Sequence, residues 1–291
     1  MAVILGLAAA VAYGVSDFVA GLMSRRINFM LVALIATTAA VTVVSIALAA
    51  TTRVPPTTGA LLWGAASGVG SACGTLALYR GLGRGQMGVV APVSAVCAAI
   101  IPVFVGVVTG ERPPLLAWVG VGLALPAIWL VSSLDGSDTA GAESGITTPG
   151  ARHTAGIQDG LLAGVAFALL FVALSQAGDG SGLWPVVANE LVALAVLVVF
   201  TGNRVRRSNH GRVPRRHALG AATVGVCGGA ATVWYFLSTH TGLLAIVAVV
   251  TSLYPAVTVV LAVLVLRERV GVTQGIGLAL SAVAVILVVG S

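Results

Sequence analysis

Long apolar segments follow one another along almost the whole chain, and this succession is the feature that most constrains its fold. Each segment holds about 20 residues, enough for an α-helix to cross the roughly 30 Å hydrocarbon core of a membrane. Only 8% of the residues are charged, against about 25% in soluble domains. The period-two alternation of outer-membrane barrel strands is absent from the sequence. We therefore predict an all-α membrane protein with ten transmembrane helices, at about residues 2–24, 28–50, 59–80, 86–109, 115–133, 157–177, 183–202, 217–239, 242–266 and 271–290.

One polar stretch, at residues 134–156, divides these helices into two sets of five. It is rich in Gly, Ser, Thr and Ala, a composition typical of flexible linkers. We predict a first five-helix repeat at residues 1–133 and a second at residues 157–291.

The two halves resemble each other in sequence. GLAAAVAY at residues 6–13 aligns with GLLAGVAF at residues 160–167, and an alignment of later segments places Glu111 over Glu268. Because each half has an odd number of crossings, the second half is inserted upside down relative to the first. Such inverted repeats are found in many secondary transporters.

The basic residues are all Arg and are distributed unevenly among the predicted loops. Thirteen of the fifteen lie on one side of the predicted membrane, six of these at residues 203–217, and only Arg53 and Arg112 lie on the other side. Arg-rich loops usually face the cytoplasm, which places both termini outside. The net charge of +6 is then a topology signal, so we expect no nucleic-acid partner and a multi-pass protein of the plasma (inner) membrane.

Asp17, in the segment AYGVSDFVAG, is the only charged residue of the first predicted helix, and Tyr13 and Ser16 fall on the same face. A charge near the bilayer centre costs about 2.5–3.5 kcal/mol, so such an acid usually faces the protein interior or a water-filled cavity. Burial of a carboxylate without a cationic partner favours its protonated form. Asp17 is therefore a candidate proton-coupling or cation-binding residue. Alternatively, it is solvated from one membrane face or paired with Arg25 or Arg26.

A second polar interruption lies in the segment WPVVANELVALAV, where Asn189 and Glu190 stand in an otherwise apolar run. Glu190 is a candidate for the same cavity as Asp17. The alternatives are a hydrogen bond to a helix terminus and a pair between helices.

Prolines inside apolar runs mark further candidates. Each removes a backbone N–H donor, which frees a carbonyl or allows the helix to bend. We predict kink or gating positions at Pro92, Pro102 and Pro255, and cavity walls at the polar residues beside them, Ser94, Thr251, Ser252 and Tyr254.

Aromatic and small residues complete the candidate set. Tyr235 is a candidate cavity residue, although Tyr79, Trp234 and Tyr235 lie near predicted helix ends, where interfacial aromatics are common. Glycines at four-residue spacing, such as Gly64 and Gly68, predict close packing between helices.

Catalytic and metal-binding signatures are missing from the sequence. It contains no HExxH, GxSxG, P-loop or dinucleotide-binding pattern, and the four His have no ligand spacing. We expect no enzymatic activity, no cofactor and no metal site.

The predicted helix duplication, AYGVSDF in the first helix and the Gly-Glu-Arg at residues 110–112 resemble the EamA-type transporters of the drug/metabolite transporter superfamily. The resemblance spans nearly the whole chain. It implies a secondary carrier with a central cavity built from helices 1–4 and 6–9, with helices 5 and 10 bracing the outside. It also implies alternating access without nucleotide hydrolysis, and both termini in the cytoplasm, opposite to the distribution of Arg.

The family's first-helix pattern is matched by Tyr13, Gly14, Ser16 and Asp17, with Asp17 in place of a frequent Asn. This change from amide to acid favours proton coupling or a cationic substrate. The equivalent position in the second half is Phe171, so only one half carries the charge.

The sequence thus predicts a secondary active transporter in the lipid bilayer, exporting small metabolites, amino acids or drug-like solutes and coupled to protons through Asp17. One alternative is an uncoupled facilitator or lipid-intermediate flippase. Another is a non-transporting membrane scaffold or sensor. Substrate identity, transport direction and oligomeric state stay open at this level.

Overall fold

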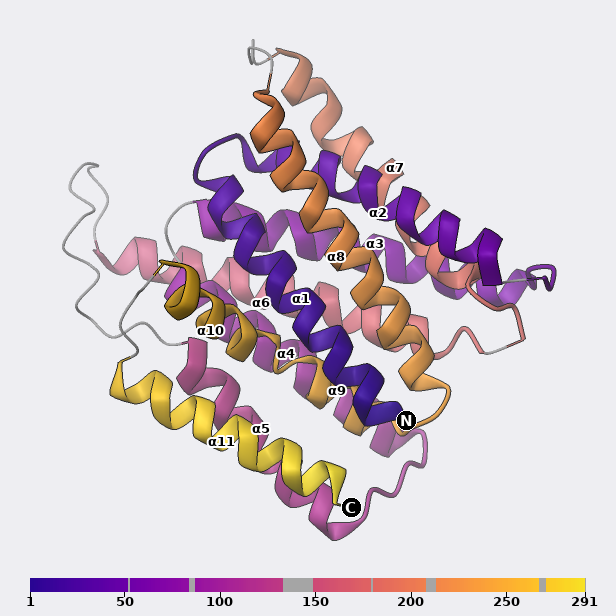
Figure 1. The fold of residues 1–291 in the computed structure, drawn as a ribbon, viewed down its shortest axis with the longest axis vertical. Helices are drawn as coiled ribbons and strands as arrows, with labels where there is room; N and C mark the ends of the chain where they lie inside the picture. Colours follow the sequence, from indigo (N-terminus) through magenta and orange to yellow (C-terminus); the bar gives the residue numbers. More distant parts are fainter. Residues whose placement is uncertain are drawn as a thin grey trace.

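The computed structural model describes residues 1–51, 53–83, 87–132, 149–178, 180–207, 213–266 and 271–290. All regular secondary structure within these ranges is helical (Figure 1). The helices are α1 (Ala2–Ser24), α2 (Phe29–Thr51), α3 (Thr58–Gly83), α4 (Met87–Val108), α5 (Leu115–Ser132), α6 (Pro149–Ser175), α7 (Trp184–Arg207), α8 (Arg215–Thr239), α9 (Leu244–Thr251), α10 (Tyr254–Leu266) and α11 (Val272–Val289).

Most helices lie where the apolar runs predict them, and α9 and α10 together occupy the ninth run. Helix α6 begins at Pro149, eight residues before the predicted start at residue 157, so the last part of the predicted linker 134–156 is helical. In the described part of the chain, seven helical segments are long and apolar enough to cross a membrane, and shorter apolar helices lie at Val93–Val108, Leu115–Val131 and Val272–Val288. Large apolar side chains such as Phe104 and Phe200 are exposed on the outside of the bundle, where lipid rather than water suits them. An all-helical membrane protein is the class that these features support.

The ninth run is broken between α9 and α10, at Ser252 and Leu253. Pro255, the second residue of α10, has no N–H to donate to the Thr251 carbonyl, so the hydrogen-bond ladder of a continuous helix is interrupted here. The chain turns at Ser252 and Leu253, whose N–H groups donate to the carbonyls of Ala248 (2.9 Å) and Val250 (3.3 Å). Pro102, in contrast, is buried within the continuous helix α4, and the side chain of Pro92 lies outside the described residues.

The two halves of the chain pack mostly against each other. Helix α1 packs on α8 and α10, α2 on α7 and α8, and α3 on α6 and α7. These contacts come in equivalent pairs: α1 on α8 corresponds to α6 on α3, and α2 on α8 corresponds to α7 on α3. A pseudo-twofold relation between the halves produces such a pairing.

Two close helix contacts repeat this relation at the level of single residues. Gly68 in α3 lies against Ala193 in α7, and Gly225 in α8 lies against Ala36 in α2. Gly225 lies 157 positions after Gly68, and Ala193 lies 157 positions after Ala36. The second contact is therefore the first one repeated with the two halves exchanged. A Cβ atom at Gly225 would collide with the Ala36 carbonyl, so glycine is what lets these backbones approach.

Glu111 makes a further connection between the halves. Its carboxylate accepts hydrogen bonds from the backbone N–H groups of Leu244 (2.6 Å) and Ala245 (3.0 Å), the first two residues of α9. It thus satisfies donors that a helix N-terminus otherwise leaves free, and it complements the positive end of the helix dipole. The residue aligned with it, Glu268, lies outside the described residues.

Helices α5 and α11 lie side by side at one edge of the bundle (Figure 1). Their contact is also made at glycines, where Gly120 meets Val288 and Gly277 meets Val131. The two chain termini lie at the same end of the bundle (Figure 1). The other helices surround the interior, in which the candidate site is found.

Candidate functional site

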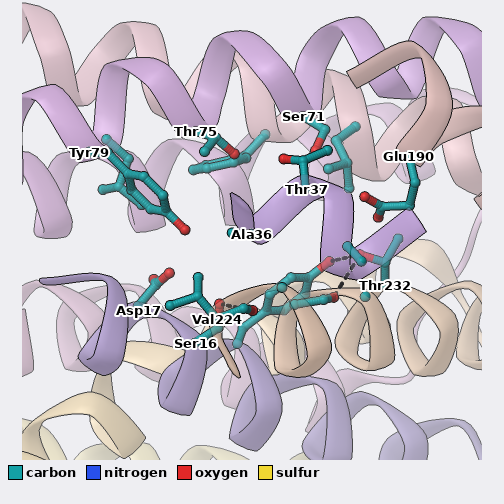
Figure 2. A pocket seen from close by; sticks show the side chains of 18 of the residues that line it. Ser16, Asp17, Ala36, Thr37, Ser71, Thr75, Tyr79, Glu190, Val224 and Thr232 are labelled. Atoms are coloured by element: carbon teal, nitrogen blue, oxygen red, sulfur yellow. Dashed lines mark hydrogen bonds between the residues drawn. The ribbon is translucent and has the colours of Figure 1, made fainter. Parts of the chain in front are cut away.

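A pocket of about 100 Å³ lies in the interior, between helices of both halves (Figure 2). Its walls come from α1, α2, α3 and α4 of the first half and from α6, α7, α8 and α10 of the second. The lining residues are Tyr13, Ser16, Asp17, Ala36, Thr37, Ala40, Ser71, Thr75, Leu78, Tyr79, Ala98, Phe167, Leu170, Phe171, Glu190, Val224, Gly225, Gly228, Gly229, Thr232 and Tyr254.

Asp17 lies at one end of the pocket, where its half-buried side chain faces Tyr79 (Figure 2). Within the described ranges, its carboxyl group has no hydrogen-bond partner and forms no ion pair with Arg25 or Arg26, which are exposed. Three aromatic side chains line the same pocket, those of Tyr13, Tyr79 and Tyr254. The carboxyl group is therefore available to a ligand or a proton from the pocket.

Glu190 lies at the other end, beside Ser71 and Thr232 (Figure 2). It is only 5% exposed, and its Oε1 accepts a hydrogen bond from Nδ2 of Asn189 (3.1 Å). The Oδ1 of Asn189 accepts in turn from the hydroxyl of Ser67 in α3 (2.9 Å). The side-chain amide of Asn189, itself held by Ser67, thus orients the carboxyl group of Glu190, which points into the pocket.

Helix α3 runs along the pocket from one acid to the other, so the helix rise measures the extent of this wall. Ser71, Thr75 and Tyr79 follow one another at four-residue spacing and line one wall, with Glu190 near the first and Asp17 near the last (Figure 2). Eight residues of α-helix rise by about 12 Å. Ser71 and Tyr79 are therefore separated along the helix axis by about 12 Å, and Glu190 and Asp17 lie beside the two ends of this row (Figure 2).

Hydroxyl groups connect α1 to α8 between the two acids. Tyr13 Oη lies 3.1 Å from Thr232 Oγ1, and the hydroxyl of Thr232 donates to the carbonyl of Gly228 (3.0 Å). Because Thr232 has one proton to donate, the arrangement in which Tyr13 donates to Thr232 satisfies both groups. Ser16 donates to the carbonyl of Val224 (3.0 Å). These bonds hold the wall that carries Asp17.

Of the residues predicted from the sequence, the structure brings Tyr13, Ser16, Asp17, Glu190 and Tyr254 together around the pocket. The others lie outside the pocket lining and are described one by one below.

Tyr235 and Asn189 are packing residues in this structure. Tyr235 is completely buried, donates a hydrogen bond to the carbonyl of Phe171 (2.9 Å) and packs on its ring with centroids 4.5 Å apart. Asn189, also fully buried, supports Glu190 from outside the pocket. Both shape the pocket through the residues they hold.

Three of the predicted polar residues beside the prolines, Ser94, Thr251 and Ser252, are also fully buried. Ser94 lies where Gly164 of α6 approaches α4, and its side chain interacts with that of Tyr254. The hydroxyls of Thr251 and Ser252, at the break between α9 and α10, have no hydrogen-bond partner among the described residues. Pro255 is buried beside the same break.

Several lining residues were not predicted from the sequence. Thr37, Ser71, Thr75 and Thr232 are scattered hydroxyls in apolar helices, and only the four-residue spacing of Ser71, Thr75 and Tyr79 could have indicated a shared face. Tyr79 is 6% exposed and lines the pocket, whereas its place near a helix end also suggested an interfacial role.

A metal centre is not formed by the described part of the chain, which brings no three His, Cys, Asp or Glu residues together. What the pocket offers a ligand is two separated carboxyl groups, a line of hydroxyls and several aromatic rings.

The comparisons with known proteins concern the family and the fold. The sequence model of the EamA-like transporter family matches residues 1–133 and 154–290. Among solved structures, a crystal structure of another protein is similar with a TM-score of 0.74 and 16% sequence identity, over 99% of this chain and 98% of that one. At this identity the likeness concerns the fold alone. No match is found among curated proteins.

Proposed function

This chain belongs to the EamA-like transporter family of the drug/metabolite transporter superfamily, and from that premise we propose that it is a secondary active transporter. It exports small metabolites, amino acids or drug-like solutes across the plasma (inner) membrane by alternating access. Transport is coupled to protons through Asp17.

The observation that carries this proposal is the pocket between the two halves. Its wall contains the Asp17 carboxyl group, which no described side chain binds. Asp17 has neither a hydrogen-bond partner nor an ion pair among the described residues, although burying a charge in a membrane is costly. A proton or a substrate cation offsets that cost. Asp17 can therefore alternate between a protonated state and a substrate-bound state.

The proposed architecture is ten crossings arranged as two inverted five-helix repeats, joined by a linker that ends before α6 begins at Pro149. The paired contacts between the halves support it, as does the repeat of Gly68–Ala193 by Gly225–Ala36. The family match in two segments, 1–133 and 154–290, divides the chain near the same linker. A pocket between two such repeats can open to one membrane face at a time as one repeat rocks against the other.

Proteoliposomes test the coupling. With a pH gradient imposed across the membrane, wild-type protein should move substrate against its concentration gradient, and Asp17→Asn should abolish this gradient-driven transport while the protein still folds. Asp138→Asn, the same substitution in the linker, is the matched control and should transport as the wild type does.

The alternatives give different results in the same assay. An uncoupled facilitator or flippase would continue to transport after the gradient is collapsed, and Asp17→Asn would leave that rate unchanged. A scaffold or sensor would transport nothing with any of the three proteins.

A further inference from the structure

Among the described residues, the pocket carries an acid at each end and no basic side chain between them. Asp17 and Glu190 are the two charged residues of the described lining, which contains no Arg or His. An anionic ligand would meet two like charges and no counter-charge, and the carboxylate of a zwitterion would have no cationic partner. The charge pattern therefore selects a cation.

The spacing of the acids selects a cation with two charged ends. Asp17 faces Tyr79 and Glu190 lies beside Ser71 (Figure 2), positions that are about 12 Å apart along α3. An ammonium group binds a carboxylate oxygen at about 2.8 Å, so one small ammonium cannot reach both acids. Over the interval of about 12 Å along α3, two such contacts leave roughly 6–7 Å between the nitrogens.

An alkyl chain of four or five carbons fits this interval. An extended chain advances by roughly 1.2 Å per bond, so the five or six bonds between the nitrogens of such a diamine cover roughly 6–7 Å. The volume agrees, because a water-sized group needs about 10–15 Å³ of space of this kind. The pocket of about 100 Å³ then holds roughly seven to ten heavy atoms, and these diamines have six or seven.

The walls between the acids suit such a chain. Ala36, Phe167 and Leu170 offer apolar contacts for methylene groups. Tyr13, Tyr79 and Tyr254 line the same pocket, and an ammonium ion near tyrosine faces gains cation–π attraction.

We propose that this pocket binds linear α,ω-diamines of four to five carbons, with one ammonium group at Asp17 and the other at Glu190. The inference rests on the proposed function, of which it names the substrate class. A proton at Asp17 and an ammonium group at Asp17 exclude each other, so uptake of a proton from the opposite side releases the diamine.

Equilibrium binding to the purified full-length chain tests the two-point contact. The probes are 1,4-diaminobutane, 1,5-diaminopentane and the monoamines 1-butylamine and 1-pentylamine, measured by isothermal titration calorimetry at constant pH and ionic strength. We expect each diamine to bind at least tenfold more tightly than the monoamine of equal length. Equal affinities of diamine and monoamine for the wild type would overturn the proposal.

Two isosteric variants separate the ends of the site. In Glu190→Gln, diamine affinity should fall at least tenfold, to the level of a monoamine, because only the contact at Asp17 is left. The remaining amine binding shows that the pocket is still folded. In Asp17→Asn, diamine affinity should fall in the same way, because only the contact at Glu190 is left. Diamine affinity that Glu190→Gln leaves unchanged would refute the second contact.

Transport distinguishes this inference from the function on which it rests. If a pH gradient drives another solute in an Asp17-dependent manner and neither diamine binds or competes, the diamine inference fails and the transporter stands. If the diamines bind through both acids but are not moved in proteoliposomes, the site stands and the transport function fails.

Discussion

Asp17 and Glu190 face one pocket from helices α1 and α7, which belong to different halves of the chain (Figure 2). Glu190 is held by Asn189 and is almost completely buried. Asp17 has no such support among the described residues. One pocket therefore combines a positioned acid with a free one, and this asymmetry gives the two residues different roles.

Removing the charge of Asp17 should not destabilise the protein. Its carboxyl group makes no hydrogen bond or ion pair in the described structure, and an amide is easier to bury than a carboxylate. We expect Asp17→Asn to unfold at or above the wild-type temperature in detergent, measured by scanning fluorimetry without substrate.

The matched comparison is Asp159→Asn. Asp159 pairs with Arg80, so loss of its charge should lower the unfolding temperature. Loss of one partner from a fully buried pair costs about 3–5 kcal/mol, and the cost here should be smaller because the Arg80 side chain is 41% exposed. A lower unfolding temperature for Asp17→Asn than for Asp159→Asn would contradict the assignment of Asp17 as the free acid.

Gly225 should not tolerate even a methyl group. A Cβ atom there collides with the Ala36 carbonyl across the contact of α8 with α2, so Gly225→Ala should cost about 1–3 kcal/mol as the helices move apart. The control is Gly122→Ala in α5, where a Cβ atom meets nothing within 4 Å. This change should be neutral or stabilise the helix by up to about 1 kcal/mol. Unfolding in detergent measures both, and equal effects would refute the close packing.

Glu111 should contribute to stability through α9. Glu111→Ala leaves the N–H groups of Leu244 and Ala245 without their acceptor, and loss of such a cap costs about 0.5–2 kcal/mol. Hydrogen exchange at the start of α9 should rise in this variant. Arg112→Ala is the control, since Arg112 is exposed and its guanidinium donates a hydrogen bond to the carbonyl of Glu111 rather than to α9. Unchanged hydrogen exchange at Leu244 and Ala245 in Glu111→Ala would show that Glu111 does not cap α9.

The Tyr13–Thr232 hydrogen bond should be measurable as a coupling energy. Tyr13→Phe and Thr232→Val each remove one hydroxyl and keep the shape of the side chain. Since the bond joins α1 to α8 at 3.1 Å, a double-mutant cycle of unfolding free energies should give a coupling of about 0.5–1.5 kcal/mol. Additive effects would show that the hydroxyls do not interact.

Much of the fold follows from local features of the sequence. The helices lie at the predicted apolar runs because about 20 consecutive apolar residues satisfy both a membrane and the backbone only as a helix. The repeat aligned Glu111 with Glu268, and the same register relates Gly68 to Gly225. Asp17 could be selected from the sequence because burying a single acid in an apolar membrane helix costs free energy whichever face of the helix carries it.

Only the tertiary structure decided which polar residues share a pocket. Tyr13 and Thr232 are 219 positions apart, and no local pattern encodes which helices meet or which face of each turns inward. The same holds for Tyr235, which packs on Phe171 instead of lining the pocket, and for Ser71 and Thr75, which line it without any chemical signature in the sequence. Hydrophobicity places each helix in the membrane, and contacts between helices far apart in the chain then place the side chains.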